Sequence, residues 1–385
     1  MPRTPPATIV GIGTSAFARS LPEEGDALAA EACRAALADA GLAPEAVDGV
    51  VTYLGAYEGA PLDQVLPAVG VDRERLALCE DVFALAPAAM TALDRAVRAV
   101  ESGRCRTVLV YKCNKWKRGL PPGMPEQPLA AGERQWTLPY GLGMTAQTLA
   151  LWAMRHFAVY GTTCEHLGAL AVQTRRHASL NPRAVLREPL TLEQYLASPW
   201  IAEPFRRLDC DYPIDGAGAA VLTTAERARD LRQRPVHVLA SATREAVWEE
   251  WEQWPDLTTM ASKPVSDAVW KECGLAPRDV DTVQLYDGFS WLALCWLEDA
   301  GFCAKGEGGP FVASGATALG GQLPLNTHGG NLSEGRSHGV GHLIEAVAQL
   351  RGTCGPRQVP GATVAFAANG GGPIAGAVVL STETT

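Results

Sequence analysis

The sequence predicts an α/β protein built from two duplicated halves, each of which alternates helices with short buried strands. The chain has 385 residues, whereas one hydrophobic core usually stops growing at roughly 250–300 residues. A segment of the first half, Gly41–Tyr53, recurs in the second half as Gly274–Tyr286. One copy in each half indicates an internal duplication and not a solenoid of short repeats.

The first half begins with a strand, a helix and a second strand. The apolar run Ala7–Gly13 predicts a buried strand. Ala27–Ala40 spaces its apolar residues as a helix does, and Gly41 follows where glycine commonly ends a helix. Val47–Tyr53 is apolar again and predicts the second strand.

A later helix–strand pair occurs in both halves. Met90–Gly103 predicts an alanine-rich helix before the strand Thr107–Tyr111. Near the end of the chain, Leu343–Gly352 predicts a helix before the strand Thr363–Ala367. The similar order of elements favours layered α/β packing in each half.

The halves are separated by a charged stretch, Glu226–Val236, which precedes a predicted strand over His237–Ala240. We therefore expect an N-terminal domain over residues 1–230 and a C-terminal domain over residues 231–385.

An insertion at about residues 112–213 interrupts the first half. It contains a Gly- and Pro-rich loop, Gly119–Gly132, and predicted helices around Ala146–Tyr160 and Thr163–His177. Because loops of this kind often build substrate sites in α/β folds, we expect the insertion to cover one face of the first domain.

Composition and charge exclude several classes of protein. Hydrophobic residues make up 47% of the chain, and the net charge of −9 is opposite to that of a general nucleic-acid binder. A basic stretch, Lys112–Arg118, is either a solvated loop or a contact for phosphate or a partner.

We expect a cytoplasmic protein, because there is no apolar run of roughly 18–20 residues, no signal-peptide pattern and no paired spacing among the ten cysteines. We expect no metal site.

Four glycine-rich or acidic motifs occur in a fixed order along the chain. They are Asp215–Leu222, Tyr286–Phe289, Asn326–Gly330 followed by Gly335, and Ala367–Gly372. In type and order they resemble the motifs of the thiolase superfamily, and the resemblance covers nearly the whole chain. It implies a thiolase-like fold, with two duplicated α/β halves in a layered αβαβα arrangement and a loop insertion in the first half.

Three positions depart from the thiolase pattern. Ala86 stands where the nucleophilic cysteine is expected, Ala368 where the acid–base cysteine is expected, and Arg336 where a histidine is expected. Without a thiolate no acyl-enzyme can form. Cys79 and Cys113 lie nearby in sequence, but neither begins a helix that would lower its pKa.

The same losses are typical of the non-thiolytic, lipid-transfer-protein-type group, the steroid side-chain-cleaving aldolases. Five further stretches resemble that group: Trp200–Pro204, Leu208–Cys210, Gly301–Glu307, Leu325–Gly330 and His338–Gly339. The resemblance implies retro-aldol cleavage of a β-hydroxyacyl-CoA, in steroid or bile-acid side-chain degradation, to a ketone or aldehyde and a short acyl-CoA.

The resemblance also implies how the chain assembles and what it binds. It implies a homodimer, in which we expect the strand Val108–Tyr111 to supply the sheet edge that pairs across the dimer axis. It implies an OB-fold, zinc-ribbon partner protein, in some cases joined to a hydratase domain. Coenzyme A enters as part of the substrate, and no cofactor is tightly bound.

A retro-aldol reaction needs a base for the β-hydroxyl proton and donors for the enolate oxygen. Tyr286 matches the first of two catalytic tyrosines in the group, and the second falls on Arg336. A phenol with an ordinary pKa of ~10 needs a neighbouring cation such as Arg336 to act as a base near neutral pH. His328 and His338 are the other candidate bases, and the choice among the three stays open. Arg336 is a candidate to bind the enolate or coenzyme A.

Backbone groups supply the candidate substrate and oxyanion contacts. Gly329 and Gly330 allow close approach of the main chain beside His328. The glycine-rich loop containing Asn369, Gly370 and Gly371 offers N–H donors for an oxyanion.

Other polar residues are assigned structural roles. We expect Tyr53 to pack, His342 to be structural, and Asp287 and Glu334 to orient loops.

Two other functions remain open. One is a thiolase-like acyltransferase with an unrecognised nucleophile, which the loss of both sulfurs disfavours. The other is a catalytically silent subunit that binds acyl-CoA as a scaffold, which the same loss does not separate from an aldolase.

Overall fold

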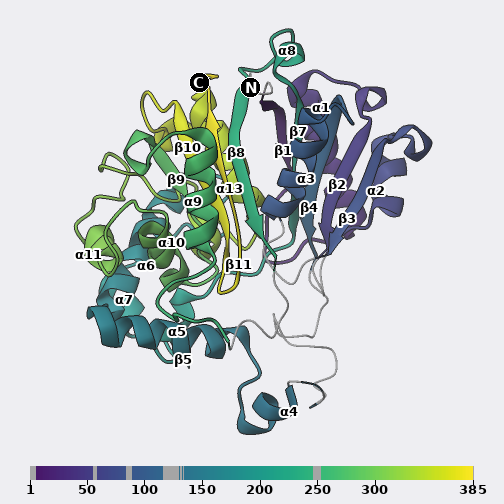
Figure 1. Ribbon diagram of the computed structural model, residues 1–385. Coiled ribbons are helices and arrows are strands. Elements are labelled where there is room, and N and C mark those ends of the chain that lie inside the picture. The colour runs from purple at the N-terminus through teal and green to yellow at the C-terminus, as the bar shows by residue number, and fades with distance from the viewer. Residues whose placement is uncertain are drawn as a thin grey trace.

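The computed structural model describes residues 6–54, 59–83, 89–115, 130, 132, 134–245 and 253–384. Within this part of the chain, nine strands form one mixed sheet in the order β3-β2-β4-β7-β1-β8-β11-β10-β9 (Figure 1). The first-half strands are β1 (Ala7–Thr14), β2 (Gly49–Leu54), β3 (Leu78–Phe83), β4 (Thr107–Asn114) and β7 (Gly216–Thr224). The second-half strands are β8 (Val236–Arg244), β9 (Thr282–Gln284), β10 (Val364–Gly371) and β11 (Ile374–Ser381).

The helices and one small hairpin complete the architecture. The first half and its insertion contain α1 (Gly25–Ala40), α2 (Leu62–Val69), α3 (Ala89–Glu101), α4 (Arg134–Thr137), α5 (Thr145–Tyr160), α6 (Cys164–Ser179), α7 (Leu192–Leu196), α8 (Ala225–Ala228) and the hairpin β5 (Trp200–Ala202) with β6 (Phe205–Arg206). The second half contains α9 (Ser262–Cys273), α10 (Ser290–Asp299), α11 (Gly308–Ala313), α12 (Gly330–Ser333) and α13 (Val340–Arg351).

The two halves correspond strand by strand. At the middle of the sheet β1 pairs antiparallel with β8, where Thr8 faces His237. Outward from this pair, β7 and β4 in one half match β11 and β10 in the other, and all are antiparallel to their inner neighbours. β2 and β9 are then parallel to β4 and β10. Tyr53 near the end of β2 and Tyr286 just beyond β9 therefore occupy equivalent places.

Three hydrophobic cores separate the layers. One core joins α1 and α2 to first-half strands. The second contains α3 and α13 together with strands of both halves. The third joins second-half strands to α9 and α10 and to the insertion helices α5 and α6. The strands of the two halves thus form two layers, with α3 and α13 packed between them. Helices α1 and α2 cover the first-half strands, and α9 and α10 cover the second-half strands, which is the expected αβαβα order.

The predicted local elements agree with the structure within a few residues. Gly41 ends α1 with φ of 71°, a left-handed conformation that favours glycine. Gly13 lets α1 lie directly on β1, because a Cβ there would come within 2.4 Å of the Ala32 carbonyl oxygen. The close contact explains why the first strand ends in glycines.

The expected place of the insertion was wrong. α6 contacts α10, α11 and α12 of the second half, and its apolar side chains belong to the core of that half. Figure 1 shows α5, α6 and α7 beside α10 and α11. Helix α10 is buried along its whole length. The insertion helix α6 packs against it and supplies part of the protein surface that buries its apolar side chains.

The expected edge strand was also wrong. β4 lies between β2 and β7 and is hydrogen-bonded on both sides, so Val108–Tyr111 is interior. At the first-half end of the sheet, the outermost strand is β3. All the residues of β4 are buried, which is typical of an interior strand.

The basic stretch turns inward where the structure describes it. Lys112 is only 2% exposed, and the Nζ atom of Lys115 lies 2.9 Å from Asp215 Oδ2. The rest of the stretch, residues 116–118, lies outside the described residues. A solvated loop is therefore wrong for Lys112.

None of the helices in the described ranges is both long and apolar enough to span a bilayer.

We propose that the two domains divide at about residue 230, between α8 and β8.

α6 carries a buried histidine that links the insertion to the second half. The Nδ1 atom of His177 lies 3.1 Å from the Leu325 carbonyl oxygen, and Nε2 accepts a hydrogen bond from the Leu319 N–H at 3.1 Å. Because Nε2 is an acceptor, this imidazole is neutral. Burial lowers the pKa of His177 to about 4.

We expect His177 to make the protein less stable in mild acid. Its imidazole titrates near 6.5 when unfolded and near 4 when folded, so only the unfolded chain binds the proton between those values. The unfolding free energy should fall by up to about 3 kcal/mol as the pH drops through this window. His177→Gln does not titrate and should show a smaller loss between about pH 7.5 and pH 5 in urea unfolding.

Gln173→Ala is the matched control. Gln173 lies one turn earlier on α6 and bonds Thr317 through both amide atoms. It does not titrate, so its loss should lower stability equally at both pH values. The same pH dependence in wild type and His177→Gln would contradict the assignment.

Candidate active site

The candidate site begins just beyond β9, where two loops lie side by side. Asn326, with φ of 50°, turns its side-chain amide onto the main chain of Leu285. Leu285 N–H donates to Asn326 Oδ1 at 2.8 Å, and Asn326 Nδ2 donates to the Leu285 carbonyl at 2.8 Å. The amide takes the place of a paired strand residue and fixes the backbone directly before Tyr286.

A third segment joins these loops from the first half. The Asp211 N–H donates to the Gly288 carbonyl at 3.0 Å, and the Arg336 N–H donates to the Tyr212 carbonyl at 2.8 Å. The Asn114 side chain, at the end of β4, donates to the Arg336 carbonyl at 2.7 Å. Main-chain bonds therefore place the Tyr286 loop and the Arg336 loop on opposite sides of one short segment.

Tyr286 lies two residues beyond the end of β9. Its side chain is half-buried, and its ring centroid lies 6.3 Å from that of His342. A Cβ at Gly288 would come within 2.6 Å of the Tyr286 ring. The absent side chain at Gly288 thus makes room for the phenol.

Arg336 and His338 lie together on the second loop. Arg336 Nε donates to His338 Nε2. Arg336 Nε also lies 3.3 Å from Asp211 Oδ2. His338 has φ of 49°, and its Nδ1 lies 3.2 Å from the Tyr53 hydroxyl oxygen. The structure thus joins two candidate residues from the sequence to a tyrosine that was expected only to pack.

His328 is enclosed by protein. It is fully buried, its Nδ1 lies 3.1 Å from Gln284 Oε1, and its Nε2 lies 3.7 Å from Glu334 Oε2. Burial lowers the pKa of His328 to about 4, so the imidazole is neutral near pH 7. In this arrangement His328 supports the loop through Gln284 and Glu334.

Glu334 anchors the same loop. Its Oε1 accepts hydrogen bonds from Arg183 Nη2 at 2.9 Å and Asn181 Nδ2 at 2.8 Å. The pKa of the Glu334 carboxyl is lowered, since Arg183 and His328 oppose the effect of burial. The expected loop-orienting role agrees with these contacts.

Asp287 explains the two glycines after His328. Its carboxylate accepts the Asn331 N–H at 2.7 Å, at the start of α12, and lies 3.2 Å from His342 Nε2. A Cβ at Gly330 would come within 1.9 Å of Asp287 Oδ2, and one at Gly329 would meet Ala178. Both glycines have positive φ. The protein's own packing therefore requires them.

The C-terminal glycines form a hairpin and not an open loop. Gly370 and Gly371 pair with Ala375 and Ile374 in the β10–β11 ladder, and the Gly370 carbonyl accepts a bond from Trp296 Nε1 at 2.8 Å. Asn369 is fully buried, and neither amide atom of its side chain has a hydrogen-bond partner among the described residues. In this motif the Asn369 amide therefore keeps hydrogen-bonding capacity that the described residues do not use.

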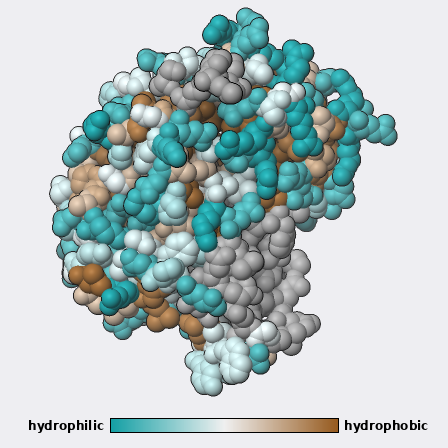
Figure 2. All heavy atoms as spheres, viewed as in Figure 1, coloured by the Kyte–Doolittle hydropathy of each residue, from teal (hydrophilic) through white to brown (hydrophobic). Residues whose placement is uncertain are grey.

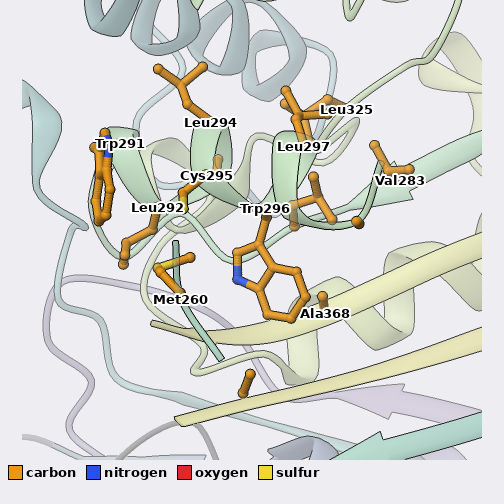
Figure 3. Packing of buried hydrophobic residues seen from close by; sticks show 14 of the residues in the cluster. Met260, Val283, Trp291, Leu292, Leu294, Cys295, Trp296, Leu297, Leu325 and Ala368 are labelled. Atoms are coloured by element: carbon orange, nitrogen blue, oxygen red, sulfur yellow. The ribbon is translucent and has the colours of Figure 1, made fainter. Parts of the chain in front are cut away.

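Sulfur is absent from the acid–base position of the thiolase pattern. Ala368 is fully buried in the apolar core beside Trp296 (Figure 3), and Ala86 lies outside the described residues. Cys113 is buried and donates to the Gly25 carbonyl. Burial raises the pKa of the Cys79 thiol, so this residue is not set up as a thiolate.

Tyr53, Lys112 and Asp211 were not predicted as residues of this site. Lys112 Nζ lies 4.4 Å from the centroid of the Tyr53 ring, and both residues line a small cavity at the start of α3. The signal that could have found Tyr53 was its match to Tyr286 in the duplicated segment. Among the described residues, no group of three His, Cys, Asp or Glu side chains is placed to hold a metal ion.

Comparison with known sequences identifies similar proteins. A family described as thiolase C-terminal domain-like matches residues 244–383. The chain is 38% identical over 366 residues to the 17-hydroxy-3-oxo-4-pregnene-20-carboxyl-CoA lyase of Mycobacterium tuberculosis, covering 90% of this chain and 92% of that protein. It is 35% identical over 358 residues to the steroid side-chain-cleaving aldolase of Thermomonospora curvata, covering 90% of each.

Solved structures show the same relationship. The Ltp2-ChsH2(DUF35) aldolase matches with a TM-score of 0.90 and 34% identity, over 98% of both chains. Human mitochondrial 3-ketoacyl-CoA thiolase matches with a TM-score of 0.71 over 99% of this chain, at 15% identity, which concerns the fold alone.

We expect no cysteine in the folded protein to react unusually fast. Burial raises the pKa of the Cys79 and Cys210 thiols, and only thiolates are strong nucleophiles. Under iodoacetamide near neutral pH, peptide mass spectrometry should show every thiol labelled no faster than in the unfolded chain. Rapid stoichiometric labelling of Cys79 or Cys113 would contradict this and favour an acyltransferase.

Proposed function

The chain belongs to the thiolase superfamily, in the group of the steroid side-chain-cleaving aldolases, and on that premise we propose that it cleaves a β-hydroxyacyl-CoA by a retro-aldol reaction. The proposal rests on one observation: the site lacks the acid–base sulfur of the thiolase pattern and has phenol, imidazole and guanidinium groups. Position 368 holds an alanine inside an apolar core. The loops of Tyr286 and Arg336 are joined through the segment Asp211–Tyr212 by main-chain bonds, and Arg336 bonds His338. These groups can move protons and stabilise anions, but they cannot form a thioester.

The reaction requires no covalent intermediate. The Tyr286 oxygen takes the proton of the β-hydroxyl, and a ketone or aldehyde forms as the Cα–Cβ bond breaks. The bonding electrons move into the thioester as an enolate. The enolate then takes the proton from the Tyr286 hydroxyl at Cα, which gives the shortened acyl-CoA and restores the base. Two groups are suited to the enolate oxygen: the positive charge of Arg336, and the amide of Asn369, which has no partner in the part of the chain that the structure describes.

The substrate class follows from the relatives. Both curated relatives are named for steroid side-chain chemistry, and one is named as a lyase of a steroid carboxyl-CoA. We propose a steroid or bile-acid side chain, with coenzyme A as part of the substrate and no tightly bound cofactor. A silent acyl-CoA-binding scaffold is the remaining alternative. Turnover of a β-hydroxyacyl-CoA to two carbonyl products, followed by mass spectrometry, separates the two.

We propose that the working enzyme is an assembly. The similar structure with a TM-score of 0.90 is that of an Ltp2-ChsH2(DUF35) aldolase, a name that joins two proteins. In the described part of this chain, exposed large apolar side chains gather on α5 and β5: Leu151, Met154, Val159, Tyr160, Trp200 and Ile201. Figure 2 shows apolar colouring along the lower edge of the molecule, over the region of α5. These residues suit an OB-fold, zinc-ribbon partner, with or without a hydratase domain.

Tyr286→Phe is the direct test of the base. The change removes one hydroxyl and keeps the ring, so the fold should survive. General acid–base groups contribute ~10²–10⁴-fold in rate, and kcat should fall by about that factor while KM changes less. Tyr140→Phe, at an exposed tyrosine outside the site, is the control.

A folded Tyr286→Phe enzyme within a few-fold of wild type would rule Tyr286 out. The base would then be His338 or His328. Arg336→Met adds a second readout. If the guanidinium helps Tyr286 to ionise, the pH–rate profile should move to higher pH.

Light scattering tests the assembly. The chain alone should have the mass of a dimer, with β3 as the edge available for pairing. Addition of the partner should raise both the mass and the lyase activity, and Leu151→Glu on α5 should weaken only this second step. Leu180→Glu, at an exposed leucine after α6, is the control. A monomeric chain with full activity and no partner would contradict the proposal.

A further inference from the structure

Tyr53 brings a phenol from the first half to the loop that carries Arg336 and His338. It is 1% exposed near the end of β2, and its hydroxyl oxygen lies 3.2 Å from His338 Nδ1. The two rings are stacked, with centroids 6.2 Å apart and planes at 25°. Lys112 Nζ lies over the Tyr53 ring, 4.4 Å from its centroid, which holds the ring by a cation–π contact.

The hydrogen bonds define the state of His338. A guanidinium has only donors, so the bond between Arg336 Nε and His338 Nε2 makes Nε2 the acceptor. A ring nitrogen that accepts carries no proton, and the neutral imidazole then carries its proton on Nδ1. Nδ1–H donates to the Tyr53 oxygen. His338 is thereby occupied at both nitrogens.

The same bonds define how Arg336 is held. Its Nε is fixed between His338 and the Asp211 carboxylate, at 3.3 Å from the latter. A long arginine side chain loses little freedom on binding a ligand when one end of its fork is already anchored. The anchor runs from Arg336 through His338 to Tyr53, that is, from the second half of the chain to the first.

We propose that Tyr53 is a positioning residue for the retro-aldol reaction, acting through His338 to hold the Arg336 guanidinium against the developing enolate. The proposal rests on the proposed function and extends it to the first half. Tyr53 itself transfers no proton to the substrate. Its hydroxyl fixes the tautomer and direction of the imidazole, and the imidazole fixes the guanidinium.

A double-mutant cycle tests this role in the full-length enzyme with its partner. Tyr53→Phe should lower kcat by about 10- to 100-fold, as expected for a misplaced group, with KM changed less. In an Arg336→Met background the same change should have an effect within about two-fold, because the group that Tyr53 positions is gone. Tyr111→Phe, which removes a buried hydroxyl bound to the Ala60 carbonyl, should leave kcat near that of wild type.

His338, which lies between Arg336 and Tyr53, allows a conservative substitution that should restore activity. The amide of Gln can accept from Arg336 and donate to Tyr53, so His338→Gln should keep most of the rate that His338→Leu loses. Equal losses in the two variants, or additive losses in the cycle, would overturn the positioning role while leaving an active aldolase in place.

Nitrogen-15 NMR of labelled histidine gives a readout that is independent of activity. Wild type and Tyr111→Phe should show His338 protonated at Nδ1 and not at Nε2, with the Nδ1 proton protected from exchange. In Tyr53→Phe that proton should exchange faster. A wild-type His338 protonated at Nε2 would overturn the inference. If the enzyme cleaves no β-hydroxyacyl-CoA, the proposed function fails and the positioning role fails with it.

Discussion

Three buried carboxylates hold the loop that carries the site, and each has its charge met by a neighbour. Glu334 is bound by Arg183, Asp287 accepts the Asn331 N–H at the start of α12, and Glu345 is bound by Arg357 Nε at 2.9 Å. The pKa of Glu345 is lowered to about 2, because nearby His328 and Arg357 outweigh burial. A buried charge without a partner is costly, so these contacts bind the loop firmly to its neighbours.

The duplication places the site where the two halves meet. Equivalent strand ends, those of β2 and β9, bring Tyr53 and Tyr286 to corresponding places in the sheet. The loop before α13 reaches between the halves, and the segment around Asp211 joins it to the Tyr286 loop. Residues from both halves therefore meet at the candidate site.

The superfamily scaffold is kept here while its chemistry is changed. Ala368 packs in an apolar core where the thiolase pattern has a reactive sulfur (Figure 3), and the neighbouring Asn369 keeps a buried amide without a partner among the described residues. Tyr286 lies on the loop after β9, and Arg336 and His338 lie on the loop between α12 and α13. Such groups suit proton transfer and enolate stabilisation, and they remove the need for acyl transfer to the protein.

The sequence by itself determined the local elements, the order of the family motifs and the loss of sulfur at position 368. These are properties of neighbouring residues, such as the glycine that ends α1, and they need no knowledge of distant contacts. The tertiary structure alone decided that β4 is interior, that the insertion covers the second half, and that His328 is enclosed. It also decided the pairing of Tyr53 with His338, which are far apart in the chain. Strand order and long-range hydrogen bonds depend on how layers pack in space, and a local pattern of side chains does not encode that packing.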